Sequence, residues 1–320
     1  MRQYRLLILV LGIAITCFLL AFAGGGERGE KRTAPLEWGL LTMRSHTDFK
    51  GRLKTNFARF ATPPKYVMFF YPLGGDFPRP YIEAPADLGA TTIVSLELYE
   101  WGPKKKPSYL PAINAGEYDE SFRKWAEDAK EFGRRVLLRF GYEFNGNWFS
   151  WSLDPPAFVK AWRRAHDIFD QVGAHNVEWV WSPNFESCPN TPENDMHRYY
   201  PGDKYVDWVA VDGYNFGDHH DQWHKWMTFD EVFAKVLASF AVRYPDKPVM
   251  LAEFGCAVGK PGRRAQWIRE AYKSLMRRPQ VKTVIWFDLD KRRKGEPDWR
   301  IDATPDSLQA FNETFAAETP

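Results

Sequence analysis

Short apolar runs recur along the chain from residue 36 onward, and amphipathic stretches separate most of the later ones. The runs are mostly continuous rather than alternating, which is typical of strands that are covered on both faces of a parallel sheet. They predict eight strands, over residues 36–42, 65–71, 91–98, 135–141, 177–182, 206–212, 247–253 and 281–287.

Helical periodicity fills the gaps between the later strands, with apolar residues three and four positions apart. It predicts helices over residues 120–133, 156–173, 229–244 and 263–278. Eight strands with helices between them indicate one (β/α)8 TIM barrel. An open doubly wound sheet is the competing arrangement, but no glycine-rich phosphate loop follows the first strand, and this disfavours it.

The N-terminus has the pattern of an export signal, because residues 6–23 carry no charge and follow Arg2 and Arg5. The apolar stretch is longer than a usual signal core and close to the length that spans a bilayer. We therefore expect residues 1–23 to be either a cleaved signal peptide or an uncleaved membrane anchor through residues 6–23. Residues 24–34 resemble a linker and 35–320 form the barrel domain, outside the cytoplasm, secreted or membrane-anchored.

Composition narrows the function further. Apolar residues make up 44% and charged residues 26% of the chain, which excludes a mostly disordered protein. The 43 Lys and Arg residues nearly balance 41 Asp and Glu residues, so no overall field favours nucleic acid. The 14 Trp, 14 Tyr and 24 Phe residues form either a large aromatic core or stacking platforms for a sugar.

Two cysteines follow the leader, Cys188 and Cys256, and in an oxidising compartment they are either two free buried thiols or a disulfide. There is no C-x-x-C pair, so we expect no structural zinc site. His and Asp residues at 218–221, together with His224, form either a solvated loop or a cation site. We expect no cofactor.

The strongest chemical signal lies at two predicted strand ends. Polar residues just past the C-terminal end of a barrel strand are the first candidates for chemistry. Glu143 follows the fourth strand and Glu253 ends the seventh, each among aromatic residues. Two carboxyl groups facing each other across a barrel mouth are what glycoside hydrolysis needs, unless each is only part of a rim ion pair. Apolar surroundings would keep one protonated, and Arg139 is suited to pair with the other.

At these segments the chain resembles glycoside hydrolase family 26, whose best-known members are endo-β-1,4-mannanases. The resemblance spans roughly residues 38–300. The matching segments are RFGYEFNGNWFSW (139–151), VEWVWSPN (177–184), YYPGDKYVDWVAVDGYN (199–215), KPVMLAEFG (247–255) and VIWFD (284–288). The resemblance implies a retaining double displacement, with Glu143 as general acid/base and Glu253 as nucleophile.

The same resemblance implies roles for the surrounding residues. Arg139 would orient the nucleophile and Tyr214 would hydrogen-bond near it. The remaining residues would contact the sugar, by stacking for Trp148 and Trp286 and by lining the cleft for Trp181 and Asn184. The expected partner is a β-linked polysaccharide, and the expected state is a monomer.

One position departs from the family pattern. Family mannanases usually carry His directly before the acid/base, whereas this chain has Tyr142, which is expected to bind substrate in its place. The departure leaves the carboxyl pair intact, but it leaves more than one sugar possible as the substrate. β-1,4-Mannan is the first expectation, and mixed-linkage β-glucan and β-1,3-xylan are the alternatives. A transglycosylase, or a non-catalytic polysaccharide-binding or assembly protein, would use the same cleft.

Overall fold

The structure is a computed structural model that describes residues 32, 34–44, 47–102, 107–219 and 224–317. The predicted leader over residues 1–23 lies outside the described residues, and so does most of the linker over 24–34. Within the part that is described, no helix combines the length and apolar character that crossing a membrane requires.

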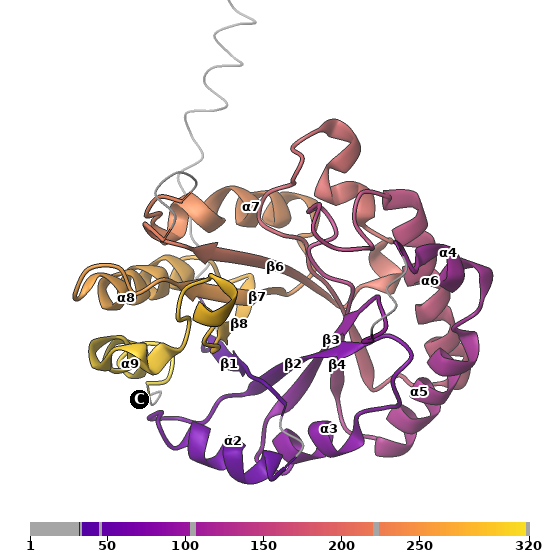
Figure 1. Cartoon of the computed structure of the whole chain (residues 1–320), viewed down its shortest axis with the longest axis horizontal. Helices are drawn as coiled ribbons and strands as arrows, with labels where there is room; N and C mark the ends of the chain where they lie inside the picture. Colours follow the sequence, from indigo (N-terminus) through magenta and orange to yellow (C-terminus); the bar gives the residue numbers. More distant parts are fainter. Residues whose placement is uncertain (1–31, 33, 45–46, 103–106, 220–223, 318–320) are drawn as a thin grey trace, which may run out of the picture.

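Eight parallel strands close into a barrel in sequence order, with the last strand paired to the first (Figure 1). This confirms the predicted (β/α)8 fold. The strands are β1 (Glu37–Leu41), β2 (Tyr66–Pro72), β3 (Thr91–Glu97), β4 (Val136–Phe140), β5 (Val177–Trp181), β6 (Trp208–Asn215), β7 (Val249–Cys256) and β8 (Val281–Phe287).

Helices surround the barrel as an outer ring (Figure 1). They are α2 (Phe49–Phe57), α3 (Arg79–Ala86), α4 (Leu110–Ala115), α5 (Asp119–Phe132), α6 (Pro155–Val172), α7 (Phe229–Arg243), α8 (Arg263–Met276) and α9 (Pro305–Asn312). Short 3-10 helices occupy the connections at η1 (Pro192–Asn194), η2 (Met196–Tyr199), η3 (Asp203–Tyr205), η4 (Arg292–Lys294) and η5 (Ile301–Ala303). The four predicted helices correspond to α5 to α8.

Local chemistry explains where the longest of these helices begins and ends. The Asp154 carboxylate accepts a hydrogen bond from the Ala157 N–H at 3.1 Å, which caps the start of α6. Gly173 ends the helix in the left-handed region, at φ 80°. Both signals are present in the sequence.

The core has two layers, because successive side chains of a strand point to opposite faces. On β8, Ile285 and Phe287 join a cluster built from strands and the loops after them, which therefore fills the barrel interior. Val284 and Trp286 join the larger cluster, which includes the apolar faces of the outer helices. The interior is thus packed with side chains, and a substrate can reach reactive groups only at the mouth of the barrel.

Candidate active site

An irregularity in β7 turns Glu253 toward the barrel mouth. Met250 and Ala252 belong to the interior cluster, so strict alternation would point residue 253 outward. The pairing with β6 shifts at this point: Leu251 pairs with Val211, but Glu253 pairs with Asp212. A bulge of this kind re-aims the next side chain, and Glu253 is accordingly buried at the mouth, with 5% of its surface exposed.

Arg139, from the interior face of β4, connects the charged groups of the site. Its Nη1 donates to Glu253 Oε1 at 2.6 Å and to Ser95 Oγ at 3.0 Å, and its Nη2 donates to Asp212. The side chain is fully buried. Burial lowers the pKa of Arg139, but Asp212 and Glu253 outweigh it and raise the pKa above its ordinary value, so the guanidinium stays charged.

The second oxygen of Glu253 is also occupied, because the Tyr214 hydroxyl donates to Oε2. The Tyr214 ring packs against Trp299 at 4.9 Å and Phe287 at 5.4 Å between centroids. Both carboxyl oxygens therefore have a positioned donor, and the group has one fixed orientation.

Glu143 lies in a tight turn just beyond β4. Its φ is 48°, in the left-handed region that residues other than glycine rarely adopt. Its N–H donates to the Ser182 carbonyl at 2.9 Å, and its carbonyl accepts from the Gly146 N–H at 2.9 Å. These bonds hold an uncommon backbone conformation in place, as is frequent at functional sites.

The donors to the Glu143 carboxyl among the described residues are neutral. Asn184 Nδ2 donates to Oε1 at 2.9 Å, and Trp148 Nε1 donates to Oε2 at 2.8 Å. Burial and the nearby charge of Glu253 raise the pKa of Glu143 to about 7, against the opposing effect of these two donors. Glu143 thus retains a proton near neutral pH, whereas Glu253 is ion-paired with Arg139.

Asn145 holds the acid-bearing loop to the neighbouring one. Its Oδ1 accepts from the Asn184 N–H at 2.8 Å, and its Nδ2 donates to the Asn184 carbonyl at 3.0 Å. The sequence alone does not mark this residue for such a role. Its only signal is an amide within an aromatic segment, which must be satisfied by hydrogen bonds once it is buried.

The structure places Trp148 and the other two nominated indoles differently. Trp148 is 47% exposed beside Glu143, as a sugar platform requires. Trp181 and Trp286 are fully buried, and each donates its N–H to a backbone carbonyl, of Tyr199 and Trp299 respectively. The predicted sugar contacts of Trp181 and Trp286 are therefore wrong, because alternation puts both on the helix-facing side of their strands.

Tyr142 is also buried, with 4% of its surface exposed. Its hydroxyl donates to Glu97 Oε1 at 3.1 Å, and its ring lies 4.3 Å from the Arg139 guanidinium carbon. It is thus a support for the charged groups in this structure, and its predicted contact with substrate stays a prediction.

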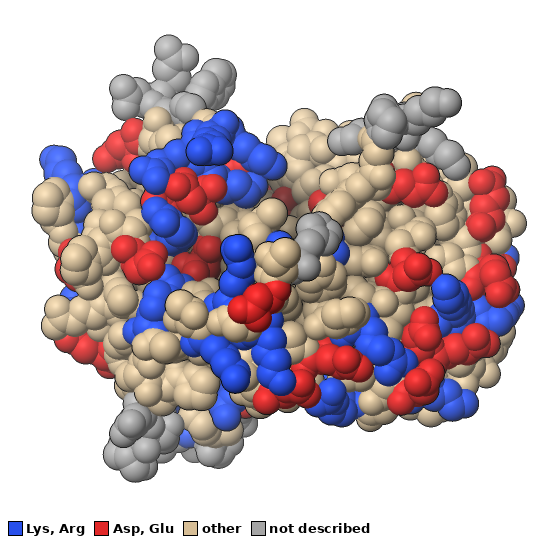
Figure 2. All heavy atoms as spheres, turned by 60° about the horizontal axis from the view of Figure 1, so that its bottom comes forward, with Lys and Arg blue, Asp and Glu red and all other residues tan. Residues whose placement is uncertain are grey.

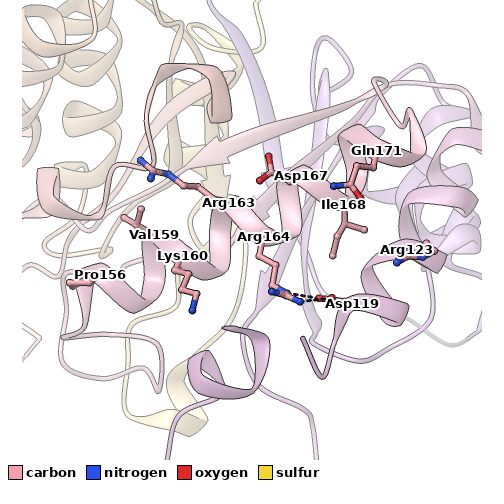
Figure 3. Close-up of a pocket in the computed structure, with 10 residues that line it drawn as sticks. All are labelled: Asp119, Arg123, Pro156, Val159, Lys160, Arg163, Arg164, Asp167, Ile168 and Gln171. Carbon is pink, nitrogen blue, oxygen red and sulfur yellow. Dashed lines mark hydrogen bonds and ion pairs between the residues drawn. The ribbon is translucent and has the colours of Figure 1, made fainter. Parts of the chain in front are cut away.

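Among the described residues, the flank of the barrel carries an ion pair beside a cavity. A cavity of about 560 Å³ lies on the flank between α5 and α6, where Arg164 occupies both oxygens of Asp119 (Figure 3). Acidic and basic side chains are interspersed over the face in Figure 2, in line with the nearly balanced charge.

For the His and Asp residues at 218–221 and for the two cysteines, the sequence left alternatives open. Residues 220–223 lie outside the described ranges, and within those ranges no group of three or more His, Cys, Asp or Glu residues could hold a metal ion. Cys188 is exposed and Cys256 is buried, and both are free thiols.

Comparison with known proteins agrees with this arrangement. The family model described as glycosyl hydrolase family 26 matches residues 117–255, which contain both Glu143 and Glu253. Endoglucanase H of Acetivibrio thermocellus is 30% identical over 98% of this chain, and the match covers 33% of that protein. Mannan endo-1,4-beta-mannosidase A and B of Caldalkalibacillus mannanilyticus is 31% identical over 34% of this chain and 22% of that protein.

A solved structure supports the fold. The GH26 beta-mannanase from Bacteroides ovatus superposes with a TM-score of 0.63 at 19% identity, covering 90% of this chain and 89% of that one. The chain spans about a third of Endoglucanase H and about a fifth of the mannosidase. The family model matches the segment that carries both carboxyl groups, and one relative aligns over nearly the whole chain, so the findings support a protein of glycosyl hydrolase family 26.

Proposed function

We propose that the protein hydrolyses internal bonds of a β-linked polysaccharide, by double displacement with retention of anomeric configuration. One observation carries the proposal: two carboxyl groups at the barrel mouth have opposite settings. Glu143 has a pKa of about 7 and accepts neutral donors, while Glu253 is ion-paired with Arg139. The pair thus separates into an acid and a nucleophile.

In the first step, Glu253 attacks the anomeric carbon while Glu143 gives its proton to the leaving glycosidic oxygen. The carbon–oxygen bond to the leaving sugar breaks, and an ester to Glu253 forms. Glu143 is then ionised. Arg139 and Tyr214, which hold the two oxygens of Glu253, keep it oriented for this attack.

In the second step, a water molecule attacks the anomeric carbon and loses its proton to Glu143. The ester bond breaks, and its electron pair returns to Glu253 as a carboxylate. Arg139 and Tyr214 then stabilise the returning charge, and both carboxyl groups regain their initial protonation states.

For the substrate, we propose mixed-linkage β-glucan ahead of β-1,4-mannan. The alignment with Endoglucanase H over nearly the whole chain supports this order, and so does Tyr142 in place of the histidine of family mannanases. Most of Endoglucanase H lies outside the match, so β-1,4-mannan stays the second candidate and β-1,3-xylan the third.

Reducing-sugar release from mixed-linkage glucan, mannan, glucomannan and β-1,3-xylan tests the proposal. We expect the wild type to release sugars from at least one polymer, and Glu253→Ala to lose activity by several orders of magnitude. Equal performance of the two proteins on every polymer would exclude hydrolysis through this pair. Binding without release would instead identify a polysaccharide-binding protein.

We also propose an extracytoplasmic location, which is supported by the uncharged stretch over residues 6–23 behind Arg2 and Arg5. N-terminal sequencing of the mature protein distinguishes the two forms of the leader. A start near residue 24 indicates a cleaved signal, and an intact N-terminus in the membrane fraction indicates an anchor.

A further inference from the structure

A second exposed indole follows the end of a strand next to the one that precedes Trp148. Among the exposed large hydrophobic side chains in the described ranges, two are tryptophans: Trp148 at 47% and Trp101 at 51% exposure. They follow the neighbouring strands β4 and β3 at their C-terminal ends. Both rings therefore lie on the face of the barrel that carries the carboxyl pair.

Each of these indoles donates its N–H to a glutamate. Trp148 donates to Glu143 at 2.8 Å, and Trp101 donates to Glu97 Oε2 at 2.6 Å. Glu97 is the last residue of β3 and is only 7% exposed. Burying a carboxyl group costs free energy unless hydrogen bonds compensate for it. The bond from Trp101 is one of those that compensate for the burial of Glu97.

Glu97 is itself held by two further aromatic donors. Its Oε1 accepts from the Tyr99 hydroxyl at 2.9 Å and from the Tyr142 hydroxyl at 3.1 Å. Burial raises the pKa of Glu97, and its aromatic donors oppose that rise. With both oxygens occupied by donors, Glu97 functions as an anchor for the rings around it.

Arg44, just beyond β1, supports Trp101 from another element. Its guanidinium carbon lies 5.0 Å from the centroid of the Trp101 ring and 4.6 Å from that of Tyr71. Cation–π contacts at these distances favour a fixed ring. Trp101 is thus held at its N–H edge and by a cation, and half of its surface remains open to a ligand.

A row of neighbouring aromatic rings, two contacts of which are stacked, runs from Trp148 to Tyr99. Trp148 is 6.5 Å from Phe149, Phe149 stacks on Trp151 at 4.4 Å, and Trp151 stacks on Tyr99 at 5.8 Å. Tyr99 shares the Glu97 carboxyl with Trp101. The mouth therefore has continuous aromatic packing from the acid to the β3 side.

We propose that Trp101 is a second stacking platform for the polysaccharide, and that Glu97 is the positioning residue that orients its indole. This inference rests on the proposed function and extends the site toward β1 and β3. The ligand is a pyranose ring of a neutral β-linked chain, whose apolar face stacks on the indole. A neutral chain is favoured because the Glu97 carboxyl lies at the N–H edge of the ring, and Arg44 is already engaged by the Trp101 and Tyr71 rings.

The test compares a polymer with a short aryl glycoside that does not extend beyond the catalytic centre. Trp101→Ala is expected to raise KM for the polymer roughly three- to tenfold, with kcat and the activity on the aryl glycoside unchanged. Trp101→Phe keeps a ring but loses the N–H, and its KM for the polymer should lie between those of the wild type and Trp101→Ala. Val242→Ala, which removes apolar surface from an exposed residue at the end of α7, is the matched control and should leave both substrates unaffected.

A double-mutant cycle tests the positioning role of Glu97. Glu97→Gln should raise KM for the polymer in the wild-type background, and it should add nothing in the Trp101→Phe background, where no N–H remains to anchor. A purely structural role of Glu97 would instead produce the same effect in both backgrounds. That outcome would overturn the assignment of Glu97.

Binding measurements separate this inference from the proposed hydrolysis. In a Glu253→Ala background, which cannot turn over substrate, gel retardation by immobilised mixed-linkage glucan or mannan reports affinity alone. Loss of retardation with Trp101→Ala supports the platform even if the wild type hydrolyses neither polymer. Unchanged retardation and unchanged KM would overturn it, whereas the proposed function would stand on the activity of the wild type.

Discussion

Tyr214→Phe separates the two chemical steps, because it removes one hydrogen bond and little else. The hydroxyl donates to Glu253 Oε2, while the ring packs against Trp299 and Phe287, contacts that phenylalanine keeps. In the double displacement Glu253 begins as a carboxylate, becomes a neutral ester, and must leave as a carboxylate. The hydroxyl therefore stabilises the second transition state more than the ester that precedes it.

The size of the effect follows from the energy of such a bond. A hydrogen bond to a charged group contributes about 1.5–3 kcal/mol, and each 1.4 kcal/mol is a factor of ten in rate. If about half of the charge has returned to Glu253 in the second transition state, the loss is about 0.8–1.5 kcal/mol, or roughly a 4- to 12-fold slower ester breakdown.

Pre-steady-state kinetics on an aryl glycoside with a good leaving group measure the rate of ester breakdown. We expect kcat and KM to fall together in Tyr214→Phe, and a burst of released phenol to appear as the ester accumulates. Tyr200→Phe is the matched control. The Tyr200 hydroxyl also donates to a carboxylate, that of Asp203 at 2.8 Å, but within the described part of the chain it does not contact either carboxyl group of the site. A fall in kcat with no burst and an unchanged or higher KM would refute the assigned role.

Further perturbations test the other parts of the site. Because the folded pKa of Glu143 is raised to about 7, the folded protein takes up a proton below that pH and loses stability as pH rises toward 7. Glu143→Gln should therefore melt at a higher temperature than wild type at pH 8, with the difference vanishing near pH 4 in calorimetric scans. Arg139→Met leaves Asp212 buried without its cation and should lower the unfolding free energy in urea by about 3–5 kcal/mol. Trp286→Ala should cost a similar ~3–5 kcal/mol through a core cavity, whereas Trp148→Ala should alter stability by less than about 0.5 kcal/mol but weaken polymer binding in titrations.

The barrel was predictable because its strands carry apolar residues on both faces and its longer helices have clear periodicity. The short helices α2, α3, α4 and α9 were not, since each has eight or nine residues at most and too few turns to establish a pattern. Their positions follow from packing against the strands and neighbouring helices rather than from local sequence.

The acidic residues of the site could be predicted from the sequence, but the directions in which the site side chains point could not. Glu143 and Glu253 could be located as lone acids at strand ends. The bulge that turns Glu253 inward cannot be read from VMLAEF, because strict alternation on that strand points residue 253 outward. The same ambiguity of face explains Trp286, which has the residue type of a platform and the position of a core residue.

The anomeric configuration of the first product tests the central claim most directly. Proton NMR can follow a β-linked polymer that the enzyme degrades, before mutarotation mixes the products. Double displacement through Glu253 predicts that the newly formed reducing end appears first as the β-anomer. An initial α-anomer would mean that water attacks directly, and it would contradict the assignment of Glu253 as a nucleophile.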